Sequence, residues 1–261
     1  MGKLRWTTQF IALALANLGL FKILEFGVCG PFFYCYGCPA AAFACPIGVM
    51  QNYAAHYTAF GHFPFYAIGT IGLFGLALGR FWCGWFCPFG LVQDLVLRIR
   101  GRQNPVKLPR ISWMKFLVLG VVLLLAWIAT DTLFCKICPA GSLFAAIPHR
   151  FISPEFSFGR FFYIHLVTLA IALVAFYFIA RFWCRYLCPL GAIFGAFNPV
   201  SILKVRVDFG KCNRCRQCLK VCPAGIEEPE EIENSTDCIR CGKCIEACKD
   251  NALSIAASLR R

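Results

Sequence analysis

Cysteine is the residue type whose spacing in this sequence most clearly predicts chemistry. The chain has 18 cysteines in 261 residues, and two segments near its C-terminus, CNRCRQCLKVC and CIRCGKCIEAC, share the spacing C-x2-C-x2-C-x3-C. Paired [4Fe-4S] clusters use this spacing, and the fourth cysteine of each segment then binds the cluster of the other segment. Zinc also binds CxxC pairs, but two complete segments favour iron and sulfur. We therefore predict two clusters, one on Cys212, Cys215, Cys218 and Cys248 and one on Cys238, Cys241, Cys244 and Cys222.

Eight more cysteines form four spaced pairs in the apolar part of the chain. The motif RFWCxxxCPxG begins at Arg80 and again at Arg181, and the motif CxxCPA begins at Cys35 and again at Cys135. Both motifs recur after about 100 residues, which predicts two consecutive structural repeats. A lone cysteine in apolar sequence is usually a small packing residue, and this is our interpretation of Cys29 and Cys45, which do not recur. The eight paired cysteines need another explanation.

The composition predicts an integral membrane protein around these pairs. Hydrophobic residues make up 59% of the chain and charged residues 15%, against about 25% charged in soluble proteins, and the mean hydropathy is +0.65. The net charge of +13 gathers at the N-terminus, between 97 and 115, and after Arg181, which is the positive-inside pattern and argues against a nucleic-acid partner. Apolar runs of about the 17 to 25 residues that cross a bilayer fall near 8–28, 63–79, 114–132 and 161–182.

This topology predicts where the cysteine pairs meet. The protein is expected in the cytoplasmic (inner) membrane, crossing it several times, with the N-terminus and the C-terminal domain in the cytoplasm. Each repeat crosses twice, so the CxxCPA motifs share the outer side and the RFWC motifs the inner side. Four thiolates on each side suffice for one further [4Fe-4S] cluster, and residues four apart, as in CxxxC, lie on one helical face. Disulfides or bound copper are alternatives for the outer pairs. The expected ligands are Cys35, Cys38, Cys135 and Cys138 outside, and Cys83, Cys87, Cys184 and Cys188 inside.

The expected fold is an all-α membrane protein with four transmembrane helices arranged as two parallel two-helix repeats. A C-terminal α+β ferredoxin domain of the bacterial type, with two [4Fe-4S] clusters, follows them. The predicted domains are 1–105 and 106–203 for the membrane repeats and 204–261 for the cytoplasmic domain. Trp82 and Trp183 fit an aromatic belt at the membrane interface, and basic residues such as Arg181 would offset the negative charge of inner iron–sulfur cores.

From about Gly79 to Leu253 the chain resembles the membrane-bound polyferredoxins, the family of the quinol dehydrogenase membrane component of periplasmic nitrate reductase. Related proteins serve nitrous-oxide reductase and copper-oxidase assembly. RFWCGWFCPFGLVQDL, FWCRYLCPLGAIFG and the two C-terminal segments carry the resemblance. It implies four helices, CxxxCP motifs at the cytoplasmic ends of the second and fourth, a cytoplasmic ferredoxin domain and exchange with quinone. The CxxCPA pairs at Cys35 and Cys135 depart from the family pattern.

Three classes of function fit these observations. The first is an iron–sulfur electron-transfer subunit of a membrane redox complex, which connects the cytoplasmic domain to quinone or to an extracytoplasmic partner. The second is a copper or disulfide reductase for cofactor assembly, in which the outer cysteines are redox-active thiols. The third is a membrane anchor whose ferredoxin domain senses redox state. Because the sequence has no constellation of catalytic acid, base or nucleophile, we expect other subunits to carry out chemistry on a substrate.

Overall fold

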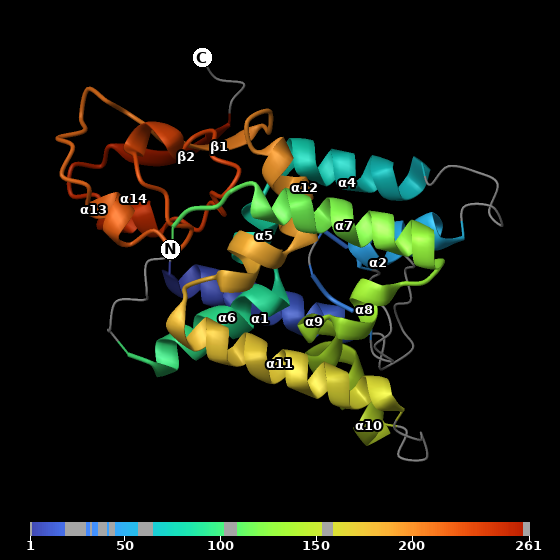
Figure 1. The fold of residues 1–261 in the computed structure, drawn as a ribbon. Helices are drawn as coiled ribbons and strands as arrows, with labels where there is room; N and C mark the ends of the chain where they lie inside the picture. The colour runs from blue at the N-terminus through green and yellow to red at the C-terminus, as the bar shows by residue number, and fades with distance from the viewer. Residues whose placement is uncertain are drawn as a thin grey trace.

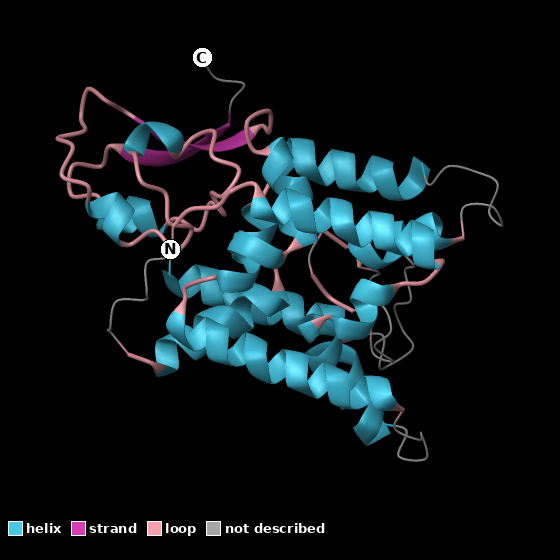
Figure 2. Ribbon diagram, viewed as in Figure 1, coloured by secondary structure: helices cyan, strands magenta, loops and turns pink. Residues whose placement is uncertain are grey.

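The computed structural model describes residues 2–18, 30–31, 33–35, 41, 45–56, 65–101, 109–152 and 159–257. Cys29 and Cys38 lie outside these residues. The structure is mostly helical, as predicted, with two short strands (Figure 2). The helices of the first half are α1 (Gly2–Ala16), α2 (Pro46–Ala55), α4 (Phe65–Leu78), α5 (Phe81–Trp85) and α6 (Pro88–Ile99). Those of the second half are α7 (Met114–Ala129), α8 (Leu133–Ile137), α9 (Pro139–Gly141), η2 (Ser142–Ala146), α10 (Ile147–Ile152), α11 (Arg160–Phe178), η3 (Trp183–Leu187) and α12 (Pro189–Phe197).

A helix is present at each of the four predicted spans, but their lengths differ. Within the described residues, α11 alone holds an apolar stretch long enough to cross a membrane, Phe161–Phe178. The apolar helices α4 and α7 have 14 and 16 residues, and α1 ends at Ala16, where the predicted span continues into residues outside the description. The four-span topology therefore stays a prediction.

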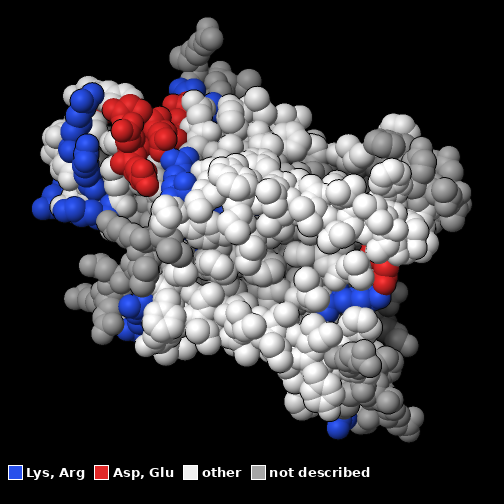
Figure 3. Space-filling view, viewed as in Figure 1, with Lys and Arg blue, Asp and Glu red and all other residues white. Residues whose placement is uncertain are grey.

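The helices run between two ends of the molecule that carry different motifs (Figure 1). The ferredoxin part and the N-terminus lie at one end, where the backbone N–H of Gly2 donates to Glu246 at 2.6 Å. The short helices α2, α8 and α9 lie toward the other end, and α8 contains Cys135 of the second outer motif. On the face shown in Figure 3, charged side chains gather at these ends, and the surface between them is largely without Lys, Arg, Asp or Glu.

Proline sets where the helices after the cysteine motifs begin. Pro46, Pro88, Pro139 and Pro189 each occupy the first turn of a helix, where the missing N–H would have no partner in any case. The preceding cysteine is extended because proline disfavours the helical region for its neighbour. Each of these cysteines is therefore the N-cap residue of the helix that follows it. They are Cys45, Cys87, Cys138 and Cys188.

The C-terminal part has the expected ferredoxin architecture. Strands β1 (Leu203–Val207) and β2 (Leu253–Ala257) pair antiparallel, with Val205 opposite Ile255. Between them lie α13 (Gln217–Lys220), η4 (Pro229–Glu231) and α14 (Lys243–Ala247). The two cysteine segments have matching backbone turns, since their equivalent positions adopt positive φ, and these are Arg214 with Arg240 and Arg216 with Gly242.

Candidate metal centres

Five ferredoxin cysteines line a single cavity of about 390 Å³. Four of them are the set predicted from the spacing for one cluster, and the fifth, Cys218, belongs to the set predicted for the other cluster. Burial raises the pKa of the Cys238 thiol to about 12, so this thiol is protonated at neutral pH until a metal replaces its proton. The cysteines of this cavity are Cys218, Cys222, Cys238, Cys241 and Cys244.

The other ferredoxin set lies nearer the surface. Cys218 is buried and interacts electrostatically with Cys212 and Cys215, and Cys215 is exposed. Cys248 packs against the same apolar core as Cys218. Of this predicted set, Cys215 is thus the cysteine that a redox partner can reach at the surface.

The inner site consists of Cys83, Cys87, Cys184 and Cys188, all of them buried. Each thiol lies within electrostatic range of the others, so the two repeats do contribute to one site. Cys83 is on α5 and Cys184 is on η3, and the other two cysteines are the N-caps of α6 and α12. Four soft thiolate donors in a buried space are the ligand set that [4Fe-4S] clusters use.

Two buried arginines join the repeats around the inner site. Arg80 of the first repeat donates through Nη2 to the carbonyl of Cys184 at 2.6 Å. Arg181 of the second repeat donates through Nη1 to the carbonyl of Cys83 at 3.1 Å. The two contacts are reciprocal, and both guanidinium groups are almost fully buried. They supply the positive charge expected beside an anionic cluster. Arg181 therefore lies where it was predicted to offset the negative charge of the inner cluster.

Asp94 balances part of this charge. It accepts hydrogen bonds from Arg181 and forms ion pairs with Arg181 and Arg5. Arg5, a residue of α1, also donates through Nε to the carbonyl of Gly84 at 2.7 Å. The basic N-terminus is therefore partly buried against the inner site, which sequence analysis did not foresee.

Gln93 places a hydrogen-bond donor on the inner site. Its Nε2 donates to the Sγ of Cys184 at 3.2 Å, and the side chain is 1% exposed. Hydrogen bonds to the sulfur atoms of a cluster stabilise its reduced, more negative state, and they are among the factors that set its potential.

We expect Gln93→Met to make the reduction potential of the inner centre more negative by about 40 mV, equivalent to about 1 kcal/mol for one electron. An EPR-monitored redox titration measures this shift. Gln9→Met is the matched control, because Gln9 is also buried but donates to the carbonyl of Gly84 and not to a thiol. Equal shifts in the two variants would contradict the assignment.

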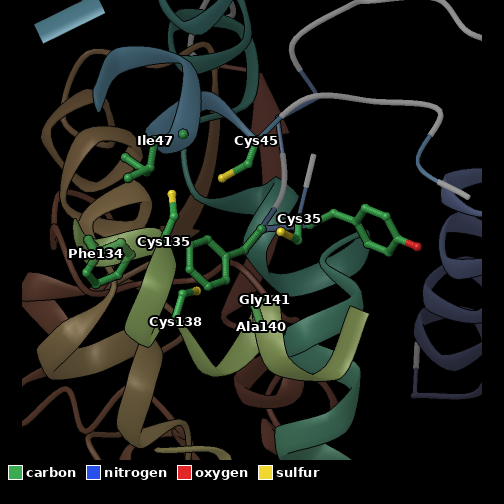
Figure 4. A pocket seen from close by; sticks show the side chains of 11 residues that line it. Cys35, Cys45, Ile47, Phe134, Cys135, Cys138, Ala140 and Gly141 are labelled. Carbon is green, nitrogen blue, oxygen red and sulfur yellow. The ribbon is translucent and has the colours of Figure 1, made fainter. Parts of the chain in front are cut away.

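The outer cavity is lined by cysteines from three segments (Figure 4). It has a volume of about 330 Å³, and Phe33, Tyr34 and Phe134 form part of its wall. In Figure 4 the thiols of Cys45 and Cys135 turn toward each other. The predicted ligand Cys38 falls outside the described residues. The interpretation of Cys45 as a packing residue does not account for its position beside three predicted ligands. The cysteines of the outer cavity are Cys35, Cys45, Cys135 and Cys138.

Aromatic side chains fill the space between the outer cavity and the inner site. Trp183, next to Cys184, packs on Phe33 and Phe134 with ring centroids 6.3 and 6.2 Å apart. Phe89, two residues after Cys87, packs on Phe33 at 5.7 Å. The prediction that Trp183 belongs to an interfacial belt is wrong, since it is 8% exposed and packs among these core rings.

The ferredoxin domain docks onto the inner site through the segment that contains Cys238. Trp85, between Cys83 and Cys87, donates through Nε1 to the carbonyl of Arg240 at 3.0 Å. Asn198 donates through Nδ2 to the carbonyl of Cys238 at 2.8 Å. The cavity lined by Cys222, Cys238, Cys241 and Cys244 is thus the ferredoxin site that adjoins the helices α1 to α12.

The donor chemistry of these sites fits iron–sulfur clusters. Within the described ranges the sites are lined by cysteine side chains, and thiolates are the ligands of both ferredoxin-type clusters and soft metals. Within the same ranges, no three His, Cys, Asp or Glu side chains gather closely enough to hold one metal ion. In a cubane cluster each thiolate binds a different iron.

Comparison with known proteins defines the class. A family described as "4Fe-4S binding domain" matches 59–105, 111–153 and 161–207, and one described as "4Fe-4S dicluster domain" matches 204–249. The three segments of the first family contain one inner pair, the outer pair Cys135 and Cys138, and the other inner pair. The chain therefore belongs to the NapH-like polyferredoxin family of ferredoxin-type 4Fe-4S electron transport proteins.

Named relatives agree with this assignment. The ferredoxin-type protein NapH of Escherichia coli is 29% identical over 80% of this chain and 73% of its own length. The putative electron transport protein YccM of Escherichia coli is 32% identical over 66% of this chain and 50% of its own length. An uncharacterized protein of Methanocaldococcus jannaschii is 28% identical over 71% of this chain and 76% of its own length. No solved structure matches the chain.

Proposed function

We propose that this protein is an electron-transfer subunit of a membrane redox complex. It carries electrons between a cytoplasmic partner and quinone or an extracytoplasmic partner, through two ferredoxin clusters and two clusters in its membrane part. The observation that carries this proposal is the contiguous series of thiolate sites. From the exposed Cys215 set, the series continues through the Cys238 set and the inner site to the outer cavity.

Contacts between neighbouring sites support a continuous path. The Cys238 segment hydrogen-bonds to Trp85 and Asn198 of the membrane part, and aromatic rings fill the space between the inner site and the outer cavity. A cluster bound in each site would supply one-electron transfer. The chain itself holds the sites at fixed separations and excludes water from the inner one.

The apolar surface supports a place in the cytoplasmic membrane. Eight of the 19 residues of α11 are large hydrophobic side chains that are exposed, and water would disfavour such a surface. The positive-inside pattern puts the N-terminus and the ferredoxin domain on the cytoplasmic side, and they do lie at the same end of the structure (Figure 1). α4 and α7 would then cross together with α11 and the first helix.

A groove between α7 and α11 offers space for the apolar tail of quinone. Its volume is about 1140 Å³, and its lining is almost wholly apolar. It reaches from Phe134 and Pro139 beside the outer cavity to Trp183 beside the inner site. A quinone in this groove would lie close to both membrane sites and could exchange electrons with either.

The test is the iron and acid-labile sulfide content of anaerobically purified protein, with EPR of the dithionite-reduced form. We expect about sixteen irons per chain, four for each of four clusters. We also expect part of the EPR signal of the reduced clusters to appear when quinol is added to the oxidised protein. About eight irons would mean that only the ferredoxin domain binds clusters. That result would reject the transmembrane path and favour the copper or disulfide reductase.

A further inference from the structure

We infer that Cys45 completes the outer [4Fe-4S] site, in the position that Cys87 holds at the inner site, and that Cys38 is not a ligand. The outer ligand set is then Cys35, Cys45, Cys135 and Cys138. This inference rests on the proposed function, because it names the residues that hold one of the two proposed membrane clusters.

The local structure around Cys45 repeats that around Cys87. The sequences CPIGVMQ and CPFGLVQ, which begin at these residues, share cysteine, proline, glycine and glutamine at the same spacing. Cys45 has φ −69° and ψ 126°, and Cys87 has φ −70° and ψ 114°. Each is the N-cap of a helix that begins with proline, and a glycine follows each cysteine three residues later, Gly48 or Gly90.

The glutamine of each motif makes the same contact across the repeats. Gln93 donates to Cys184 at 3.2 Å, and Gln51 donates through Nε2 to the Sγ of Cys135 at 3.4 Å. Both glutamines are buried, and both Oε1 atoms lack a hydrogen-bond partner within the described residues. A buried amide without a full set of partners is unfavourable, and its occurrence at both positions points to equivalent roles. Cys45 is therefore related to Cys135 as Cys87 is to Cys184.

The second repeat has the same arrangement. Cys138 and Cys188 are N-caps followed by proline and, three residues later, by a glycine. The N–H of Gly191 donates to the Sγ of Cys188 at 3.3 Å. The segment with Cys138 also matches the same 4Fe-4S family as the segments with the inner pairs. All four motifs thus end in CPxG at a helix start. The distance along the sequence from the first cysteine of each motif to the cysteine of CPxG differs, and it is longest between Cys35 and Cys45.

The outer cavity itself has the composition of a cluster site. Its four thiols come from three segments of chain, and Gly48 and Gly141 line it together with aromatic side chains. The glycines leave room next to the thiols, and the rings exclude water. Cys45 and Cys138 are 8% exposed, so both are withheld from solvent as ligands of a buried cluster are.

The experiment compares Cys45→Ala with Cys38→Ala, both purified anaerobically as the full chain. We expect about sixteen irons in the wild type and in Cys38→Ala, and about twelve in Cys45→Ala, since one four-iron cluster is lost. Alkylation of the wild-type protein with iodoacetamide, followed by mass spectrometry, provides a second readout that does not require a folded variant. Cys45 should react only after iron is removed.

The possible outcomes separate this inference from the function it rests on. Loss of about four irons in Cys38→Ala, or a full iron content in Cys45→Ala, would overturn the inference and leave the membrane clusters in place. Alkylation of Cys45 before iron removal would overturn it in the same way. A wild-type content of about eight irons would instead reject the membrane clusters altogether.

Discussion

Asp237→Asn is expected to destabilise the protein by about 3–5 kcal/mol, because it removes one partner of a buried ion-pair network. Asp237 is 3% exposed, and its carboxylate accepts hydrogen bonds from Ser112 and Lys115 and from Arg110 Nε at 2.9 Å. Lys115 is fully buried, so the variant would leave its charge without an anion. The network joins the ferredoxin domain to the start of α7, and its loss should separate the two parts.

The same carboxylate predicts a pH dependence. Burial by itself would raise the pKa of Asp237, but the charge of Lys115 and hydrogen bonds from Lys115, Ser112 and Arg110 outweigh burial and hold the pKa well below its usual range. A carboxyl group whose pKa is lowered by folding stabilises the protein above its unfolded pKa, about 3.9. This stabilisation decreases as the pH falls below that value and is lost as the pH falls through the folded pKa.

Thermal unfolding followed by visible absorbance at several pH values tests both statements. The wild type should lose stability as the pH falls below about 4, and Asp237→Asn should lack this component. Asp208→Asn is the control, since its side chain is 53% exposed and pairs with Lys211 on the surface. Similar behaviour of the two variants would show that the buried network does not hold the domain in place.

Gly84→Ala should disturb the contact between the inner site and the ferredoxin domain. A Cβ atom at Gly84 would lie 2.2 Å from the carbonyl oxygen of Ile239, which belongs to the cysteine segment of the adjoining ferredoxin site. Backbone on both sides must then move apart by about 1 Å to restore ordinary contact. Overpacking of this kind destabilises by about 1–3 kcal/mol, which corresponds to a Tm lowered by about 2–12 °C in a chain of this size.

Gly84→Ala should also slow electron transfer between the inner site and the adjoining ferredoxin site, because the transfer rate falls steeply as the distance between two clusters increases. The measurement is the Tm together with the rate at which one cluster is reoxidised through the other after rapid mixing. Gly72→Ala is the matched control, since a Cβ there has no neighbouring atom within 4 Å. An unchanged rate and Tm in Gly84→Ala would refute the close contact.

The sequence by itself determined the chemistry and the class of this protein. Cysteine spacing predicted the iron–sulfur motifs and the ferredoxin domain, because the ligands of one loop must match neighbouring corners of one cluster. The repeat of RFWCxxxCPxG predicted that Cys83 and Cys184 meet in one site, and the structure does bring them together. These features are local, or recur nearly unchanged, so periodicity and spacing suffice to find them.

Only the tertiary structure decided which distant residues complete the sites. Cys45 was set aside because it does not recur at the repeat offset, yet it lines the outer cavity together with Cys35. The CPxGxxQ sequence that it shares with Cys87 was a signal that could have found it. Asp237 and Asn198 looked like ordinary polar residues, and their roles depend on the packing of the ferredoxin domain against α7 and α12. Long-range burial and charge pairing have no fixed spacing along the chain, and therefore no sequence period reveals them.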